Sequence, residues 1–121
     1  MKLTKIAYLT SAVYDFVLGL AFLVMPATLF KIVNITPPNH WGYVSFAALM
    51  LMIFGIMFYK IFKNPSTNKN LIPYSIMLKI AYCAVVFGYF IFSSMPCLWV
   101  IFGVCDFIFL LLFIRAYYQV K

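Results

Sequence analysis

Acidic residues are almost missing from this sequence of 121 residues, which contains no glutamate and only two aspartates, Asp15 and Asp106. Histidine occurs once, as His40, and the chain has no HExxH, GxSxG, P-loop or GxGxxG motif. A pair of catalytic carboxylates would therefore have to be the two aspartates themselves. The sequence predicts no catalytic residue and no cofactor.

Charged residues of either sign are also scarce, at 9% of the chain, whereas hydrophobic residues make up 67%. A soluble domain contains about 25% charged and roughly 45–50% apolar residues. A chain of this composition could not cover its surface with polar groups in water, so we expect its solvent to be lipid. The 14 phenylalanines and nine tyrosines suit a protein with two membrane interfaces.

The three cysteines, Cys83, Cys97 and Cys105, are an odd number, form no CxxC motif and lie in apolar runs. We interpret them as small packing residues. Cys97 and Cys105 lie on one predicted helix about 12 Å apart along its axis, too far for a disulfide. His40 is distant from all three in sequence and precedes Trp41, which indicates an interfacial position. No metal site is expected.

Four apolar runs are long enough to cross a bilayer core, which takes roughly 20 helical residues. They cover residues 6–25, 41–59, 71–92 and 97–114. Only residues 93–96, which end in a proline, separate the last two runs, so these helices should be antiparallel neighbours. The sequence predicts an all-α, up-down-up-down four-helix bundle that forms a single transmembrane domain over residues 1–121.

Two further features refine this topology. The connection at residues 27–40 places Lys31 among apolar neighbours, which predicts a short interfacial helix. The first run is too long for a cleaved signal peptide and contains Asp15, so we expect it to remain as a span.

Basic residues are distributed unequally between the two sides of the predicted bundle. One side has only Lys31, whereas the other carries Lys2, Lys5, Lys60, Lys63, Lys69, Arg115 and Lys121. The positive-inside rule therefore predicts that both termini are cytoplasmic. The net charge of +7 is concentrated at the ends of the apolar runs, which indicates contact with anionic membrane lipids and not with nucleic acid.

Three ionisable residues, Asp15, Lys79 and Asp106, fall inside the apolar runs. The aspartates lie about ten residues, or roughly 15 Å, into their helices, so all three can reach one layer near mid-membrane. An isolated charge there costs at least about 2.5–3.5 kcal/mol. We therefore expect Lys79 to pair with both aspartates inside the bundle. The excess negative charge should be matched by a proton on one carboxyl group, or by a proton or cation held nearby.

Helical periodicity surrounds these charges with polar and aromatic side chains. Ser11 shares a face with Asp15, while small residues at Ser45, Ala48 and Gly55 of the second span allow close packing. The sequence predicts a polar-aromatic interior whose site residues are Ser11, Asp15, Ser75, Lys79, Tyr82, Trp99 and Asp106.

Three functions are compatible with such an interior. The leading interpretation is a non-enzymatic membrane protein whose interior binds a small ligand or proton, with transport as one use of such binding. The second is an accessory subunit or assembly factor whose charge cluster is purely structural, and the third is a membrane enzyme acting on a lipid or quinone. A chain of 14.0 kDa is small for a lone transporter, so we expect at least a dimer if the protein acts in transport. Partners other than membrane lipids, whether a second copy or another subunit, are left open.

Several short motifs occur in a suggestive order along the chain. They are Tyr14-Asp15, Leu18-Gly19, Phe22, Pro26, Leu29-Phe30, Pro37-Pro38, Phe54-Gly55, Leu78-Lys79, Gly103 and Asp106-Phe107. With these motifs in this order, the chain resembles small bacterial four-helix membrane proteins of the DoxX-like group. The resemblance implies a multi-pass protein of the bacterial inner membrane. Some members of that group are associated with quinol-linked redox systems.

Overall fold

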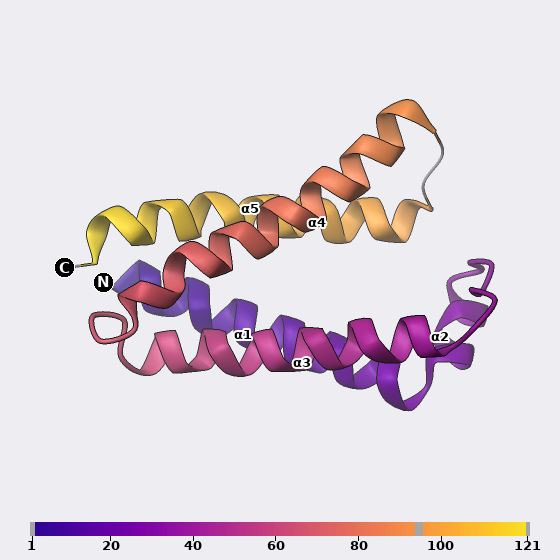
Figure 1. Ribbon diagram of the computed structural model, residues 1–121, viewed down its shortest axis with the longest axis horizontal. Helices are drawn as coiled ribbons and strands as arrows, with labels where there is room; N and C mark the ends of the chain where they lie inside the picture. Colours follow the sequence, from indigo (N-terminus) through magenta and orange to yellow (C-terminus); the bar gives the residue numbers. More distant parts are fainter. Residues whose placement is uncertain (1, 94–95, 121) are drawn as a thin grey trace.

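The computed structural model describes residues 2–93 and 96–120, and within these ranges its regular structure consists of helices alone, without any strand (Figure 1). The elements are α1 (Lys2–Val24), α2 (Pro26–Ile32), α3 (Gly42–Lys63), η1 (Lys69–Leu71), α4 (Ile72–Phe92) and α5 (Cys97–Gln119). Helices α1, α3 and α5 and the segment Lys69–Phe92 are long and apolar enough to cross a membrane. The predicted all-α membrane bundle is confirmed, and the chain is a multi-pass membrane protein.

The helices extend beyond the predicted apolar runs at the end of the bundle where the basic residues gather. Helix α1 begins at Lys2, α3 ends at Lys63 and α5 ends at Gln119. Long basic side chains can remain helical there because their charged groups reach the interface. The short interfacial helix expected between the first two spans is α2, which has a proline in its first turn.

The predicted break at residues 93–96 lies partly outside the described residues, because Ser94 and Met95 are not among them. On either side, α4 ends at Phe92 and α5 begins at Cys97. These two helices pack against each other as antiparallel neighbours, as the sequence predicted.

The four long helices form two layers, α1 with α3 and α4 with α5. Figure 1 shows the layers close together near both termini and farther apart toward α2. Within the first layer the backbones approach closely at two glycines. A Cβ atom on Gly19 would lie 2.5 Å from the Ala48 carbonyl oxygen, and one on Gly55 would lie 3.0 Å from the Ala12 carbonyl oxygen. Helices α1 and α5 join the layers, whereas α3 and α4 contact each other little.

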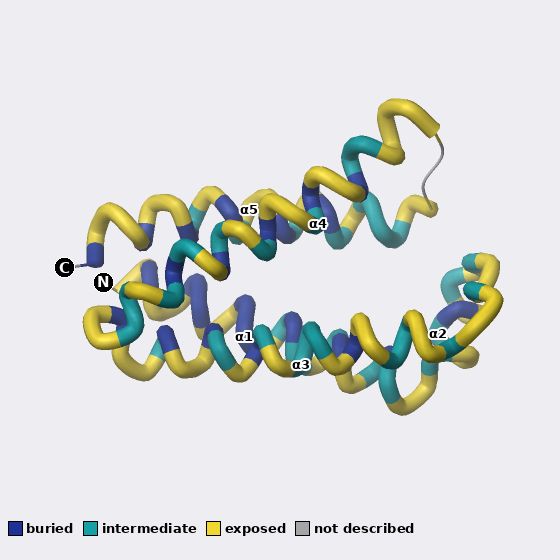
Figure 2. Tube along the Cα trace, in the orientation of Figure 1, coloured by how far each residue is buried: buried dark blue, intermediate teal, exposed yellow. Residues whose placement is uncertain are grey.

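The half of the bundle nearest the termini, which we call the closed half, is filled by aromatic side chains. Tyr8, Phe58 and Phe113 are fully buried there, and the rings of Tyr8 and Phe113 stack with centroids 4.2 Å apart. Figure 2 shows buried segments on the facing sides of both layers in this half. The layers are therefore held together mainly at one end.

Candidate functional site

The three intramembrane charges form one cluster between the layers. Lys79 Nζ of α4 donates hydrogen bonds to Asp15 of α1, at 3.3 Å from Oδ2 and 3.4 Å from Oδ1, and to Asp106 Oδ1 of α5 at 3.1 Å. The side chains of Lys79 and Asp15 are each 1% exposed, and that of Asp106 is 11% exposed. The predicted pairing of one lysine with two aspartates is confirmed.

The lysine ammonium is supported from the closed half by aromatic rings. Its Nζ lies 5.3 Å from the ring centroid of Phe58 and 5.4 Å from that of Phe109, within the range of a cation–π interaction. Carboxylate hydrogen-bond acceptors and aromatic ring faces thus both stabilise the charged lysine in a place that water does not reach.

A second polar pair lies in the closed half. The Tyr8 hydroxyl and Ser75 Oγ are 2.8 Å apart, and Ser75 donates its own proton to the Ile72 carbonyl oxygen at 2.6 Å. Since Ser75 has only one hydroxyl proton, Tyr8 must be the donor to Ser75. Both hydroxyl groups are therefore satisfied within the protein.

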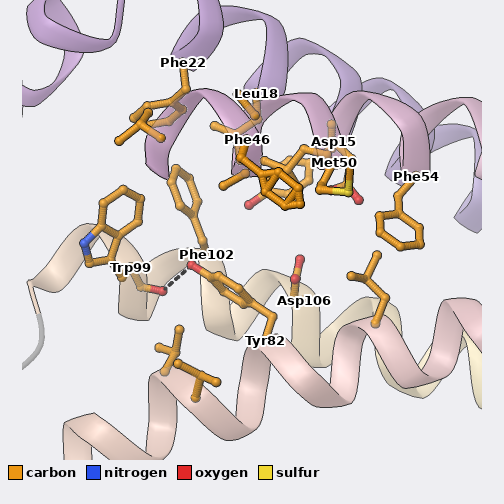
Figure 3. A pocket seen from close by; sticks show the side chains of 18 of the residues that line it. Asp15, Leu18, Phe22, Phe46, Met50, Phe54, Tyr82, Trp99, Phe102 and Asp106 are labelled. Carbon is orange, nitrogen blue, oxygen red and sulfur yellow. Dashed lines mark hydrogen bonds between the residues drawn. The ribbon is translucent and has the colours of Figure 1, made fainter. Parts of the chain in front are cut away.

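On the other side of the charge cluster, the diverging layers leave a cleft of about 640 Å³. Asp15 and Asp106 lie at its floor, whereas Lys79 is not among the residues that line it. Figure 3 shows Asp106 projecting from its helix toward the opposite layer, where Asp15 lies. The volume falls within the roughly 300–1,000 Å³ typical of small-molecule sites. The cleft therefore presents carboxylate oxygens, with the ammonium group behind them.

The end of the cleft near α2 is covered by four aromatic residues, Phe22, Phe30, Trp41 and Trp99, which we call the aromatic cap. Ring centroids of Phe22 lie 6.0 Å from Phe30 and 5.9 Å from Trp99, and those of Phe30 and Trp41 are 5.4 Å apart. The cap brings together residues from α1, α2, α5 and the start of α3. Three of its members, Phe22, Phe30 and Trp99, also line the cleft.

The two long sides of the cleft differ. Between α1 and α5 the Tyr14 ring bridges the layers, with centroids 6.2 Å from Phe102 and 5.8 Å from Phe109. Between α3 and α4 there is little contact, and exposed residues of both helices, such as Ala47 and Val85, line the cleft. We call this opening the mouth. In a bilayer it would face the acyl chains.

Polar groups around the cleft are few. Tyr82 donates a hydrogen bond from its hydroxyl to the Trp99 carbonyl oxygen at 3.3 Å, which ties α4 to α5 (Figure 3). Among the described residues, the buried Tyr14 hydroxyl has no hydrogen-bond partner. The charge cluster is thus the main polar feature that the cleft offers to a ligand.

The seven site residues suggested by the sequence do not all reach the cleft. Four of them line it: Asp15, Tyr82, Trp99 and Asp106. Lys79 lies beneath the floor, while Ser11 and Ser75 are buried but are not among the lining residues. Their proposed part in binding a ligand stays a prediction.

Sequence reasoning missed most of the contribution of α3 to the cleft. It singled out the face with Ala48 and Gly55, which packs against α1, and of these two residues only Ala48 lines the cleft. The residues that line the cleft from α3 include Tyr43, Phe46, Met50 and Phe54. Their spacing of three or four residues places them on one face, but a face directed at lipid would have the same apolar composition. No residue type distinguishes the two environments.

Within residues 2–93 and 96–120, no group of three or more His, Cys, Asp or Glu side chains is arranged to hold a metal ion. Comparisons of the chain with protein-family models, with curated proteins and with solved structures find no match. The resemblance to the DoxX-like group therefore stays a prediction, and the interpretation of the site rests on its geometry.

Proposed function

We propose that this membrane protein binds a small lipophilic molecule in the cleft between its two helix layers. The observation that carries the proposal is a ligand-sized cleft of about 640 Å³ with the carboxyl groups of Asp15 and Asp106 at its floor. Apolar walls with a small number of convergent polar groups are the usual composition of a small-molecule site. Intramembrane charges are typically found where a substrate or ion is handled.

The openings of the cleft support entry from the bilayer. The aromatic cap covers the end near α2, and the aromatic core of the closed half lies between the floor and the termini. The mouth between α3 and α4 is the side that the helices leave least covered. A molecule dissolved among the acyl chains would reach the carboxyl groups without crossing a polar headgroup layer.

The shape of the cleft argues against a partner helix as its occupant. A spanning helix needs a groove along the whole hydrocarbon thickness of about 30 Å. Here the charge cluster closes the groove on one side and the aromatic cap closes it on the other. A compact molecule fits this enclosed space better than a helix does.

The location of the protein in the cell is part of the proposal. The seven basic residues at the end with the termini support a cytoplasmic position for that end. The resemblance to DoxX-like proteins supports the bacterial inner membrane.

Trp99 provides a direct test because it lines the cleft, and Trp41 is the only other tryptophan. In a Trp41→Phe background reconstituted in phosphatidylcholine nanodiscs, Trp99 fluorescence would be titrated with three aromatic lipophiles. These are tetraphenylphosphonium, tetraphenylborate and triphenylphosphine oxide. We expect a saturable change in Trp99 fluorescence with at least one of them, beyond the partition into lipid measured in nanodiscs that lack this protein.

Matched variants show whether the cleft is the site. Ala47→Phe with Val85→Phe fills the mouth from both sides and should abolish saturable binding. The control, Leu49→Phe with Ala84→Phe, also introduces two phenylalanines, at neighbouring exposed positions that do not line the cleft, and should leave binding intact. If no probe gives a saturable change, or if both double variants bind equally well, the cleft is not a ligand site. A purely structural charge cluster would then be the better account.

A further inference from the structure

We infer that the cleft selects organic cations, that is, lipophilic molecules with one positively charged group. This inference rests on the proposed function and adds the chemical class of the ligand to it. Three observations support it: the charge balance of the floor, the side of the charge cluster that faces the cleft, and the aromatic composition of the walls.

The charge balance is the first step. The cluster contains the carboxyl groups of Asp15 and Asp106 and the ammonium group of Lys79, so its formal sum with all three ionised is −1. No other Asp or Glu occurs in the chain, and the remaining Lys and Arg residues lie near the ends of the helices. A positive charge in the cleft would make the cluster neutral in a medium that disfavours a net charge.

The second step is the direction from which the charges can be reached. Lys79 is 1% exposed, does not line the cleft, and lies near the rings of Phe58 and Phe109. Asp106 keeps an 11% exposed side chain, and of its two oxygens Oδ1 is the one bonded to Lys79. A ligand therefore meets carboxylate oxygen first, and the ammonium group that would repel a cation lies behind it.

The third step is the chemistry of the walls, which favours an organic cation over a metal ion. Hard cations take about six or more oxygen ligands, whereas Asp15 and Asp106 provide the only carboxyl groups that line the cleft. Ring faces attract organic cations within about 6 Å of their centroids. Many lining residues are aromatic, among them Tyr14, Phe46, Phe54, Tyr82, Trp99 and Phe102.

Tetraphenylphosphonium and tetraphenylborate have nearly the same shape and opposite charge, so they isolate the sign of the charge. In the Trp99 fluorescence assay, with concentrations expressed per lipid, we expect the phosphonium to bind about tenfold or more tightly than neutral triphenylphosphine oxide. The borate should give no saturable change. This ranking is measured on the unaltered floor and does not depend on any charge variant folding.

Asp106→Asn then tests whether the floor is the cause. It leaves one Asp15–Lys79 pair and a formal charge of zero, so the phosphonium should lose most of its advantage over the neutral probe. Equal binding of the cation and the neutral probe, or tighter binding of the borate, would overturn the inference while leaving the proposed function intact. An advantage that Asp106→Asn does not reduce would also overturn it. Failure of all three probes to saturate would remove the proposed function itself.

Discussion

The closed half of the bundle and the half that contains the cleft are made from the same apolar and aromatic residue types, yet they pack differently. In the closed half the rings of Tyr8, Phe58 and Phe113 fill the space between the layers. In the open half the aromatic side chains stand along the walls of a cleft of about 640 Å³. The Asp15–Lys79–Asp106 cluster lies at the boundary.

The difference shows how a charge cluster can be buried by protein on one side and still be accessible to a ligand on the other. At the end near α2 the two layers contact each other through the aromatic cap, where the ring of Phe30 packs against Trp99. Close glycine contacts keep α1 against α3. One half of the bundle is therefore filled by side chains, whereas the other half contains the cleft.

The largest effect should come from removing the cation at the boundary. Lys79→Met leaves two buried carboxyl groups without a partner, so the unfolding free energy should fall by about 3–5 kcal/mol. The protein would be unfolded by titration with dodecyl sulfate in mixed micelles, and circular dichroism would report the loss of helix. As the control, Lys79→Met combined with Asp15→Asn and Asp106→Asn should recover much of the loss. An unchanged stability for Lys79→Met alone would mean that the cluster does not join the layers.

The next largest effect on stability should come from removing a packed aromatic ring, and it should differ between the two halves. Phe113→Ala empties part of the closed half and should cost about 2–3 kcal/mol, less than in a soluble core because the unfolded side chain also sits in lipid. Phe46→Ala, on the exposed wall of the cleft, should stay within about 0.5 kcal/mol of the unaltered protein. The same titration measures both. Equal losses at the two positions would show that the open half is packed as tightly as the closed half.

A smaller effect is expected from adding a methyl group at two helix glycines. Gly19→Ala brings a Cβ atom against the Ala48 carbonyl oxygen and should destabilise by about 1–2 kcal/mol, since overpacking forces the backbones apart. Gly88→Ala meets nothing within 4 Å and should cause no loss. Thermal unfolding in the same detergent compares the pair. A tolerated Gly19→Ala would contradict the close α1–α3 contact.

The smallest effect concerns two buried serines near the boundary. Ser75→Ala leaves the Tyr8 hydroxyl without an acceptor and should cost about 0.6 kcal/mol, a typical value for a hydrogen bond between membrane helices. Ser11 Oγ has no partner among the described residues, so Ser11→Ala should be neutral or slightly stabilising. Replicate thermal unfolding resolves the sign of this difference. A larger loss of stability for Ser11→Ala than for Ser75→Ala would contradict the Tyr8–Ser75 hydrogen bond.

The helices and their order could be predicted from the sequence, because the signals for them are local. Length and composition identified the four apolar runs. The short connection at residues 93–96, which ends in a proline, indicated that α4 and α5 are neighbours. The pairing of Lys79 with both aspartates was also predictable, since the chain has few ways to neutralise charge at that depth.

The candidate site could be predicted only in part. The sequence correctly brought Asp15 and Asp106 to one place, but it treated Ser11 and Ser75 as equal members of the site, and they lie outside the cleft lining. It also gave no indication of the wall formed by Phe46 and Phe54. Side chains that face lipid and side chains that face an apolar cleft have the same composition.

The sequence by itself determined that this chain is a membrane protein with four spanning helices and that its three intramembrane charges lie near one depth. These properties depend on hydrophobicity and on distance along a helix, which each segment carries alone. Only the tertiary structure decided that Lys79 is covered from the closed half while the carboxyl groups face a cleft. That choice depends on how far the two layers separate, which is set by aromatic side chains from distant segments that meet only in the folded bundle.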